Sequence, residues 1–90
     1  MSASSEDDTE VVVVLPADLH ARPAGAVSRL AATFDAEVEM ISDHRVAPAD
    51  SVLMVMGLGA RAGQEITVRA RGRQAAEAVT ALAAALSTIT

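Results

Sequence analysis

Residues 11–34, VVVVLPADLHARPAGAVSRLAATF, hold a strand, a loop and a helix in direct succession, and this order decides the fold. The run Val11–Leu15 is apolar and rich in β-branched side chains, a pattern that favours a buried strand. Pro16 ends this strand, because proline has no N–H to donate to a strand ladder. A short loop over residues 16–19 then leads into the helix.

A helix is indicated after the loop by apolar residues that recur every three or four positions. These residues are Val27, Leu30, Ala31 and Phe34. Pro23 fits the first turn of this helix, where the N–H that proline lacks would have no intrahelical partner. The helix is therefore predicted to begin near His20 or Ala21.

The rest of the chain repeats the two patterns, with alternation for strands and helical spacing for helices. It predicts, in order, a strand at 37–41, a turn at 42–43, a strand at 44–47, a helix at 52–58 capped by Asp50 or Ser51, a strand at 65–69 and a helix at 74–89. The order β-α-β-β-α-β-α predicts an α+β open-faced sandwich, in which three helices cover one face of a four-stranded antiparallel or mixed sheet. Residues 1–9 are predicted to be a disordered acidic N-terminal tail, so that the folded domain spans 10–90.

Composition excludes several classes of function. Ninety residues are enough for one small domain with one hydrophobic core. The absence of cysteine excludes disulfides, thiolate metal sites and cysteine nucleophiles. The seven basic residues are all arginine, twelve residues are acidic and Phe34 is the single aromatic, so we expect no nucleic-acid binding. No apolar run approaches the roughly 20 residues of a membrane helix, and the acidic N-terminus is unlike a leader. We expect a cytoplasmic protein without membrane insertion.

The imidazole of His20 stands at the predicted helix start, where the backbone favours bound anions. The N–H groups of Ala21 and Arg22 would have no intrahelical partners, and the helix dipole adds partial positive charge there. The guanidinium of Arg22 can add charge-assisted hydrogen bonds to an anion. Neutral imidazole is also a nucleophile that forms covalent intermediates. The residues alone do not identify the anion, and they leave open a histidine that only caps the helix, a small ligand-binding module or a stand-alone enzyme.

The stretch Leu19–Ala24, LHARPA, resembles the active-site signature of the HPr family, the phosphocarriers of the bacterial phosphoenolpyruvate-dependent sugar phosphotransferase system. A second stretch, Ser51–Gly59 (SVLMVMGLG), followed by Gly63 and a strand from Glu65, is similar to the family's second characteristic block. The resemblance covers about residues 11–88, and the family fold has the same order of strands and helices.

The resemblance implies a relay. Enzyme I, charged by phosphoenolpyruvate, would phosphorylate Nδ1 of His20 to give a pros-phosphohistidine, and His20 would then pass the group to enzyme IIA domains. Ala21, Arg22 and Pro23 would stabilise the phosphoryl group. The resemblance also implies a carrier that needs no bound cofactor of its own. A monomer is the simplest expectation for a diffusing carrier, and without a second acid–base group near His20 in sequence we expect no catalysis without a partner enzyme. The acceptor stays open between sugar uptake, a nitrogen-linked regulatory branch and a dihydroxyacetone kinase relay.

A docking surface is expected beside this histidine, because the apolar run at 52–56 is too dense for one face of a short helix. By the resemblance, the outward residues of this run dock both enzyme I and enzyme IIA. The candidates are Leu53, Met54 and Met56, with Ala24 and Val27 or Ser28 across from them. Methionine side chains are flexible and suit a surface that must fit several partners.

Ser51 and His44 suggest two further sites. Ser51 matches a regulatory position that a kinase phosphorylates in part of the family, and it is also a candidate helix N-cap. Asp50 stands where the regulated branch usually has lysine, and an acid there would repel an added phosphate, so we favour the cap. His44, beside Asp43, suggests half of a metal site with His20, but no further ligands stand at recognisable spacing. We therefore expect no metal.

Overall fold

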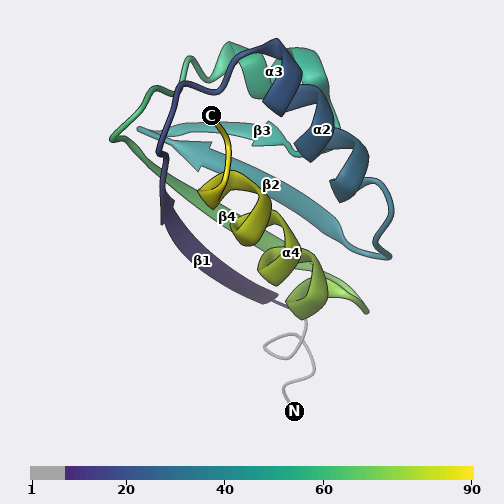
Figure 1. The fold of residues 1–90 in the computed structure, drawn as a ribbon. Coiled ribbons are helices and arrows are strands. Elements are labelled where there is room, and N and C mark those ends of the chain that lie inside the picture. The colour runs from purple at the N-terminus through teal and green to yellow at the C-terminus, as the bar shows by residue number, and fades with distance from the viewer. Residues whose placement is uncertain (1–7) are drawn as a thin grey trace.

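The computed structural model describes residues 8–90 and arranges them in one sheet and three helices (Figure 1). The elements are β1 (Asp8–Val14), α2 (Ala21–Ala31), β2 (Glu37–Ser42), β3 (Arg45–Pro48), α3 (Val52–Gly57), β4 (Glu65–Arg71) and α4 (Ala75–Ser87). The predicted order β-α-β-β-α-β-α is confirmed. Within these residues the four strands form a single sheet in the order β1-β4-β2-β3, and every neighbouring pair is antiparallel.

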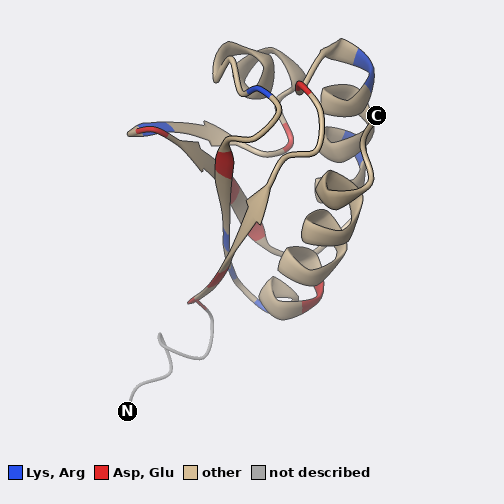
Figure 2. Ribbon diagram, turned by 60° about the vertical axis from the view of Figure 1, so that its left-hand side comes forward, with Lys and Arg blue, Asp and Glu red and all other residues tan. Residues whose placement is uncertain are grey.

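The helices lie on one side of the sheet and leave its other face open (Figures 1 and 2). α4 crosses the sheet, and the short α3 lies beside α2 next to β3. Alternation along each strand decides which side chains meet the helices. On β4, Ile66, Val68 and Ala70 are buried, whereas the residues between them point to the open face. The fold is therefore the α+β open-faced sandwich that the sequence predicted.

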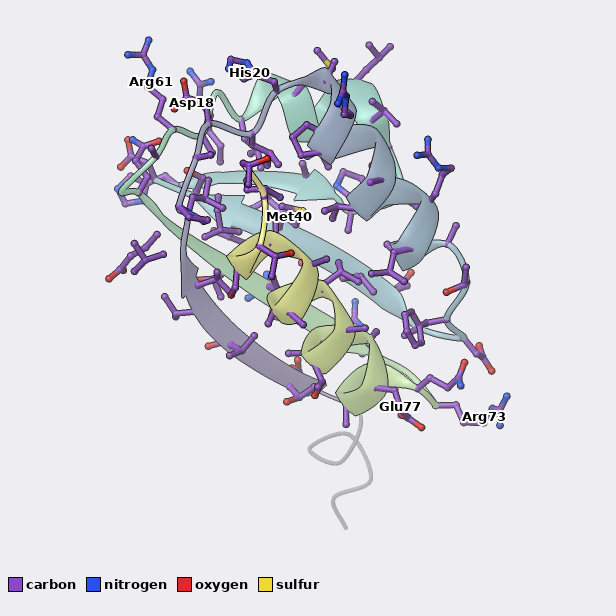
Figure 3. All side chains as sticks on the ribbon, viewed as in Figure 1. Asp18, His20, Met40, Arg61, Arg73 and Glu77 are labelled. Atoms are coloured by element: carbon purple, nitrogen blue, oxygen red, sulfur yellow. The ribbon has the colours of Figure 1, made fainter. Side chains whose placement is uncertain are left out.

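The core lies between the sheet and the two longer helices and consists of aliphatic side chains. α4 contributes Ala78, Leu82 and Leu86, all fully buried and spaced along one helix face. Met40 of β2 is also fully buried in this layer (Figure 3). On α2 the buried residues are Ala24, Val27, Ser28 and Ala31. Packing of that face against the core fixes where the first turn of α2 stands.

Arginines of β4 pair with carboxylates across the open face of the sheet. Arg69 stands in register with Glu10 on β1 and Glu39 on β2, and its Nη2 donates to Oε1 of Glu39 at 2.9 Å. This hydrogen bond to Glu39 raises the pKa of the Arg69 guanidinium. Arg71 donates in the same way to Glu37 at 3.3 Å. The two guanidinium groups are thus already bound to carboxylates.

The sheet begins earlier in the chain than predicted. β1 starts at Asp8, and Asp8 and Thr9 pair with Arg71 and Ala70 of β4. The prediction that these two residues belong to a disordered tail is therefore wrong. Asp8 and Glu10 stand at exposed strand positions, which need no apolar side chain, and the partly buried Thr9 alternates with them. The rest of the predicted tail, residues 1–7, lies outside the described residues.

The hairpin between β2 and β3 turns at Asp43 and His44, one residue later than predicted. These residues have left-handed φ angles of 50° and 74°, and Ser42 pairs with Arg45. Two residues with positive φ match the twist of the flanking strands, and Asp and His adopt this region more readily than most residues. His44 is therefore an exposed turn residue, and β3 begins only at Arg45.

Several other element ends differ from the prediction by one or two residues. β4 continues to Arg71 because it pairs with both β1 and β2 at that end. α3 stops at Gly57 with Leu58 as its C-cap. α4 is limited to Ala75–Ser87, with Thr88 as its C-cap. None of these differences changes the topology.

Candidate functional site

His20 is the N-cap of α2, with backbone angles φ −77° and ψ −178°. Its carbonyl accepts the hydrogen bond that Ala24 N donates at 2.9 Å. The N–H groups of Ala21 and Arg22 precede that bond and have no intrahelical acceptor, and Pro23 has no N–H. The predicted helix start is confirmed, and it leaves two backbone donors directly after His20.

The imidazole of His20 is exposed although its backbone is held in place. The side chain is 78% exposed and makes no capping hydrogen bond. Its neighbour Leu19 is buried and donates its N–H to Ala60 O at 3.0 Å. Gly63 N donates to Leu15 O at 2.8 Å at the other end of the loop. These bonds fix the β1–α2 loop to the α3–β4 loop, so a partner can reach the imidazole without moving the backbone.

Asp18 also lies at this site, although no pattern in the sequence singled it out. Its Oδ1 accepts a hydrogen bond from Ala62 N at 2.8 Å, and its Oδ2 lies 3.7 Å from Nε2 of His20 (Figure 3). The backbone carbonyl of Asp18 accepts from His20 N at 3.0 Å. The signal that could have indicated Asp18 is a carboxylate two residues before a histidine at a helix start. Its bond to Ala62, 44 positions along the chain, could not be inferred from the sequence.

Arg22 offers an unpaired cation in the first turn of α2. Its side chain is exposed, and within residues 8–90 its guanidinium makes no hydrogen bond and no ion pair. By contrast, Arg69, Arg71 and Arg73 each bond to a carboxylate at 2.9–3.3 Å. Arg22 is therefore free to turn toward an anion bound at the start of α2.

Three apolar side chains of α3 point outward, as the sequence predicted. Leu53, Met54 and Met56 are 81%, 52% and 39% exposed, whereas Val55 is fully buried. α3 packs against α2, whose first turn follows His20. We call the three exposed residues the α3 patch.

Ala24 and Val27 do not belong to this surface, and the prediction that they face a partner is wrong. Ala24 is 0% and Val27 is 1% exposed, and the alternative Ser28 is buried as well. A helix that packs on a core has one buried face, and these residues share it with Ala31 at helical spacing. Their side chains therefore support the position of α2 rather than contact a partner.

Ser51 is the N-cap of α3. Its Oγ accepts a hydrogen bond from Met54 N at 3.3 Å, which is the capping role that the sequence favoured. Asp50 beside it is exposed. Phosphorylation of Ser51 would break this capping hydrogen bond and place a phosphoryl group beside the negative charge of Asp50. The geometry thus favours a structural role for Ser51 over a regulatory one.

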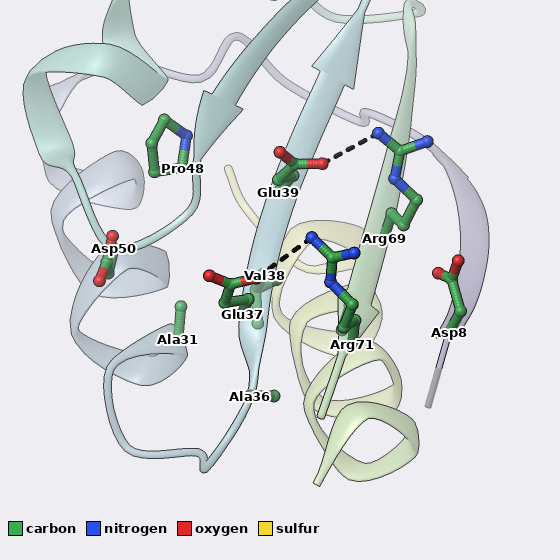
Figure 4. Close-up of a pocket in the computed structure, with 11 residues that line it drawn as sticks. Asp8, Ala31, Ala36, Glu37, Val38, Glu39, Pro48, Asp50, Arg69 and Arg71 are labelled. Carbon is green, nitrogen blue, oxygen red and sulfur yellow. Dashed lines mark hydrogen bonds and ion pairs between the residues drawn. The ribbon is translucent and has the colours of Figure 1, made fainter. Parts of the chain in front are cut away.

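A hollow of about 580 Å³ is lined mainly by residues of β2 and β4, with Ala31 at the end of α2 and Asp50 at its margin (Figure 4). Its two guanidinium groups, those of Arg69 and Arg71, are bound to Glu39 and Glu37. Further acidic side chains line the same hollow, and none of its residues comes from the β1–α2 loop or the first turn of α2. The hollow therefore has no free cation for a phosphoryl group.

Neither a metal site nor a membrane helix is found in the part of the chain that the structure describes. Within residues 8–90 no three His, Cys, Asp or Glu side chains are grouped so that they could hold a metal ion. No helix in that range has the length and apolar character that crossing a membrane requires. The suggested half-site of His44 and His20 thus gains no further ligands.

Comparison with known proteins identifies the family. The family model described as the PTS HPr component phosphorylation site matches residues 8–88. The phosphocarrier protein HPr of Haloferax volcanii is 40% identical over 80 residues, which cover 86% of this chain and 90% of that protein. A multiphosphoryl transfer protein of Xanthomonas campestris is 35% identical over 81 residues, which are 90% of this chain but only 10% of that longer protein.

Solved structures agree with this result. The crystal structure of a phosphocarrier protein HPr from Bacillus anthracis matches with a TM-score of 0.82 and 32% sequence identity, and the match covers 88% of this chain and 96% of that one. Sequence and fold therefore agree over nearly the whole described length. The chain belongs to the HPr family, the phosphocarrier proteins of the phosphotransferase system.

Proposed function

We propose that His20 accepts a phosphoryl group on Nδ1 from phospho-enzyme I and donates it to enzyme IIA domains of sugar permeases. The observation that supports this most directly is the exposed imidazole at the N-terminus of α2, with two unbonded N–H groups and the free guanidinium of Arg22 beside it. Such donors favour a doubly charged phosphoryl group. The protein acts as a carrier in the cytoplasm and not as an enzyme, and its partners complete the reacting site.

The transfer needs no proton relay. The Nδ1 lone pair of neutral His20 attacks phosphorus while the bond between phosphorus and the donor breaks, and that electron pair stays with the donor. Nε2 keeps its hydrogen throughout, and the positive charge of the phosphorylated ring is shared by both nitrogens. Transfer to the acceptor is the same step in reverse.

The first turn of α2 would hold the phosphoryl group only loosely. Ala21 and Arg22 supply one backbone N–H each, and Pro23 contributes by fixing the backbone of the turn rather than by donating. Arg22 adds its guanidinium. A carrier needs this balance, because stronger binding of the phosphorylated ground state would raise the barrier to release.

The proposal is tested by incubating the protein with labelled phosphoenolpyruvate and purified enzyme I. We expect label on the protein that is lost in acid and stable in base, a ³¹P resonance typical of phosphate on Nδ1, and a monomer of 9.2 kDa by light scattering. Label should then move to an added enzyme IIA domain. A folded protein that takes up no label from its cognate enzyme I would refute the carrier assignment and leave an anion-binding module.

The α3 patch supplies the docking surface in this proposal. It is apolar, it lies on a helix packed against α2, and two of its three side chains are methionine. A surface of this kind can fit two successive partners because methionine side chains adapt to different shapes. Both enzyme I and enzyme IIA would therefore use it.

Leu53→Ala should raise the KM for enzyme I by about fivefold to tenfold, because exposed anchors of an interface commonly contribute about 1 kcal/mol or more to binding. The kcat should change little, since His20 and its surroundings are untouched. Initial rates of label uptake at varied carrier concentration measure both constants. Val12→Ala is the matched control, because Val12 is 54% exposed on the open face of the sheet. Equal KM values for the two variants would exclude the α3 patch as the docking surface.

A further inference from the structure

Asp18 is held so that one carboxylate oxygen is anchored and the other faces His20. Oδ1 accepts from Ala62 N at 2.8 Å, so the side chain is fixed to the α3–β4 loop. Oδ2 takes no part in that hydrogen bond and lies 3.7 Å from Nε2 of His20. The backbone carbonyl of Asp18 accepts a hydrogen bond from His20 N. Figure 3 shows the two side chains together at the start of α2. The carboxylate is therefore held at the start of α2, beside the imidazole.

Asp18 faces the Nε2 side of the His20 ring, and this determines its effect on the tautomer of the imidazole. A neutral imidazole carries one hydrogen, and the partner of one nitrogen decides which nitrogen bears it. An ionised carboxylate only accepts hydrogen bonds, so its negative charge near Nε2 favours the form with hydrogen on Nε2. The lone pair is then on Nδ1.

We propose that Asp18 is a positioning residue that holds His20 in the Nε2–H tautomer and so presents the Nδ1 lone pair to phosphorus. This rests on the proposed phosphocarrier function of His20. After transfer, Nε2 keeps its hydrogen and the ring is positively charged, and the Asp18 carboxylate is its counter-charge on the side away from the phosphoryl group. Arg22 in α2, Arg61 within the α3–β4 loop and Glu65 at the start of β4 are the other charged residues in or next to these loops in sequence.

Asp18→Asn separates the anchoring role from the positioning role. The amide oxygen can still accept from Ala62 N, but an NH₂ group now replaces Oδ2 and donates toward Nε2. That donor favours the opposite tautomer, with hydrogen on Nδ1 and a blocked lone pair. Since both side chains are largely exposed, at 45% for Asp18 and 78% for His20, we expect the ratio of Nε2–H to Nδ1–H to fall about two- to fivefold.

The tautomer ratio is measured directly from ¹⁵N chemical shifts of the imidazoles at a pH where both are neutral. His44, in the β2–β3 turn, is the internal control and should not change. The kcat for label uptake from enzyme I should fall in proportion to the fraction of His20 in the Nε2–H form, which the measured ratio gives, with KM unchanged. If Asp18→Asn does not fold, Asp18→Ser removes the charge, and the His20 ratio should again fall.

An unchanged His20 tautomer ratio in a folded Asp18→Asn protein would overturn the proposal, and so would a changed ratio with an unchanged kcat. The tautomer measurement needs no phosphoryl donor, so it can fail while the wild-type protein still takes up label. Conversely, a wild type that takes up no label would refute the carrier function itself, whatever the tautomer ratio is.

Discussion

Replacing His20 with alanine should reduce phosphoryl uptake from enzyme I to background, a loss of roughly a thousandfold or more. The substitution removes the nucleophile. The N–H donors at the start of α2 remain, but they can only bind a phosphoryl group and cannot attack phosphorus. Protein stability should stay within about 0.5 kcal/mol, since the imidazole is 78% exposed and makes no capping bond. Label uptake and urea unfolding on the same preparation check both statements.

His44→Ala is the matched control for this experiment. The chain has two histidines, and His44 is also exposed, but it lies in the β2–β3 turn and not at a helix start. We expect label uptake to be unchanged. If His20→Ala retained acid-labile label and His44→Ala lost it, the phosphohistidine would have to be placed at the turn, and the role of α2 would be wrong.

The position of His20 was predictable because every signal for it is local. A β-branched apolar run, a proline in a first turn and an apolar helical repeat all lie within residues 11–34. By contrast, the turn at Asp43 and His44 contains no glycine, so nothing marked its positive φ angles, and the predicted turn was one residue early. The order β1-β4-β2-β3 depends on pairings between distant residues and could not be read from the chain.

The residues of the candidate site show the same difference between local signals and contacts made far along the chain. Arg22 adjoins His20 in sequence, but the place of Asp18 depends on its bond to Ala62 in a loop far along the chain. The sequence places Val27 both in the apolar repeat of the core and among the candidates for the docking surface, and one side chain cannot serve both. Its 1% exposure settles that conflict in favour of the core. The helical repeat was the more reliable signal, because burial of one face is what stabilises a helix in a domain of this size.

Leu82→Ala should lower the free energy of unfolding by about 2–5 kcal/mol, the range for a leucine removed from a packed core. Leu82 is fully buried in the middle of α4, in the same core as Met40 and Ile66. A small domain has only about 5–15 kcal/mol of stability in total, so the variant should unfold at a clearly lower urea concentration. The expected loss is large because Leu82→Ala leaves a cavity between α4 and the sheet, where no exposed side chain can move in to fill it.

Leu53→Ala makes the same chemical change at a residue that is 81% exposed, and it should alter stability by no more than about 0.5 kcal/mol. The two variants thus separate the two uses of leucine in this protein. Leu82→Ala should weaken folding and, under conditions where it is folded, take up label with normal KM. Leu53→Ala should fold normally and dock poorly. Equal urea midpoints for the two variants would contradict the packing of α4 described here, because burial would then not determine what each leucine contributes.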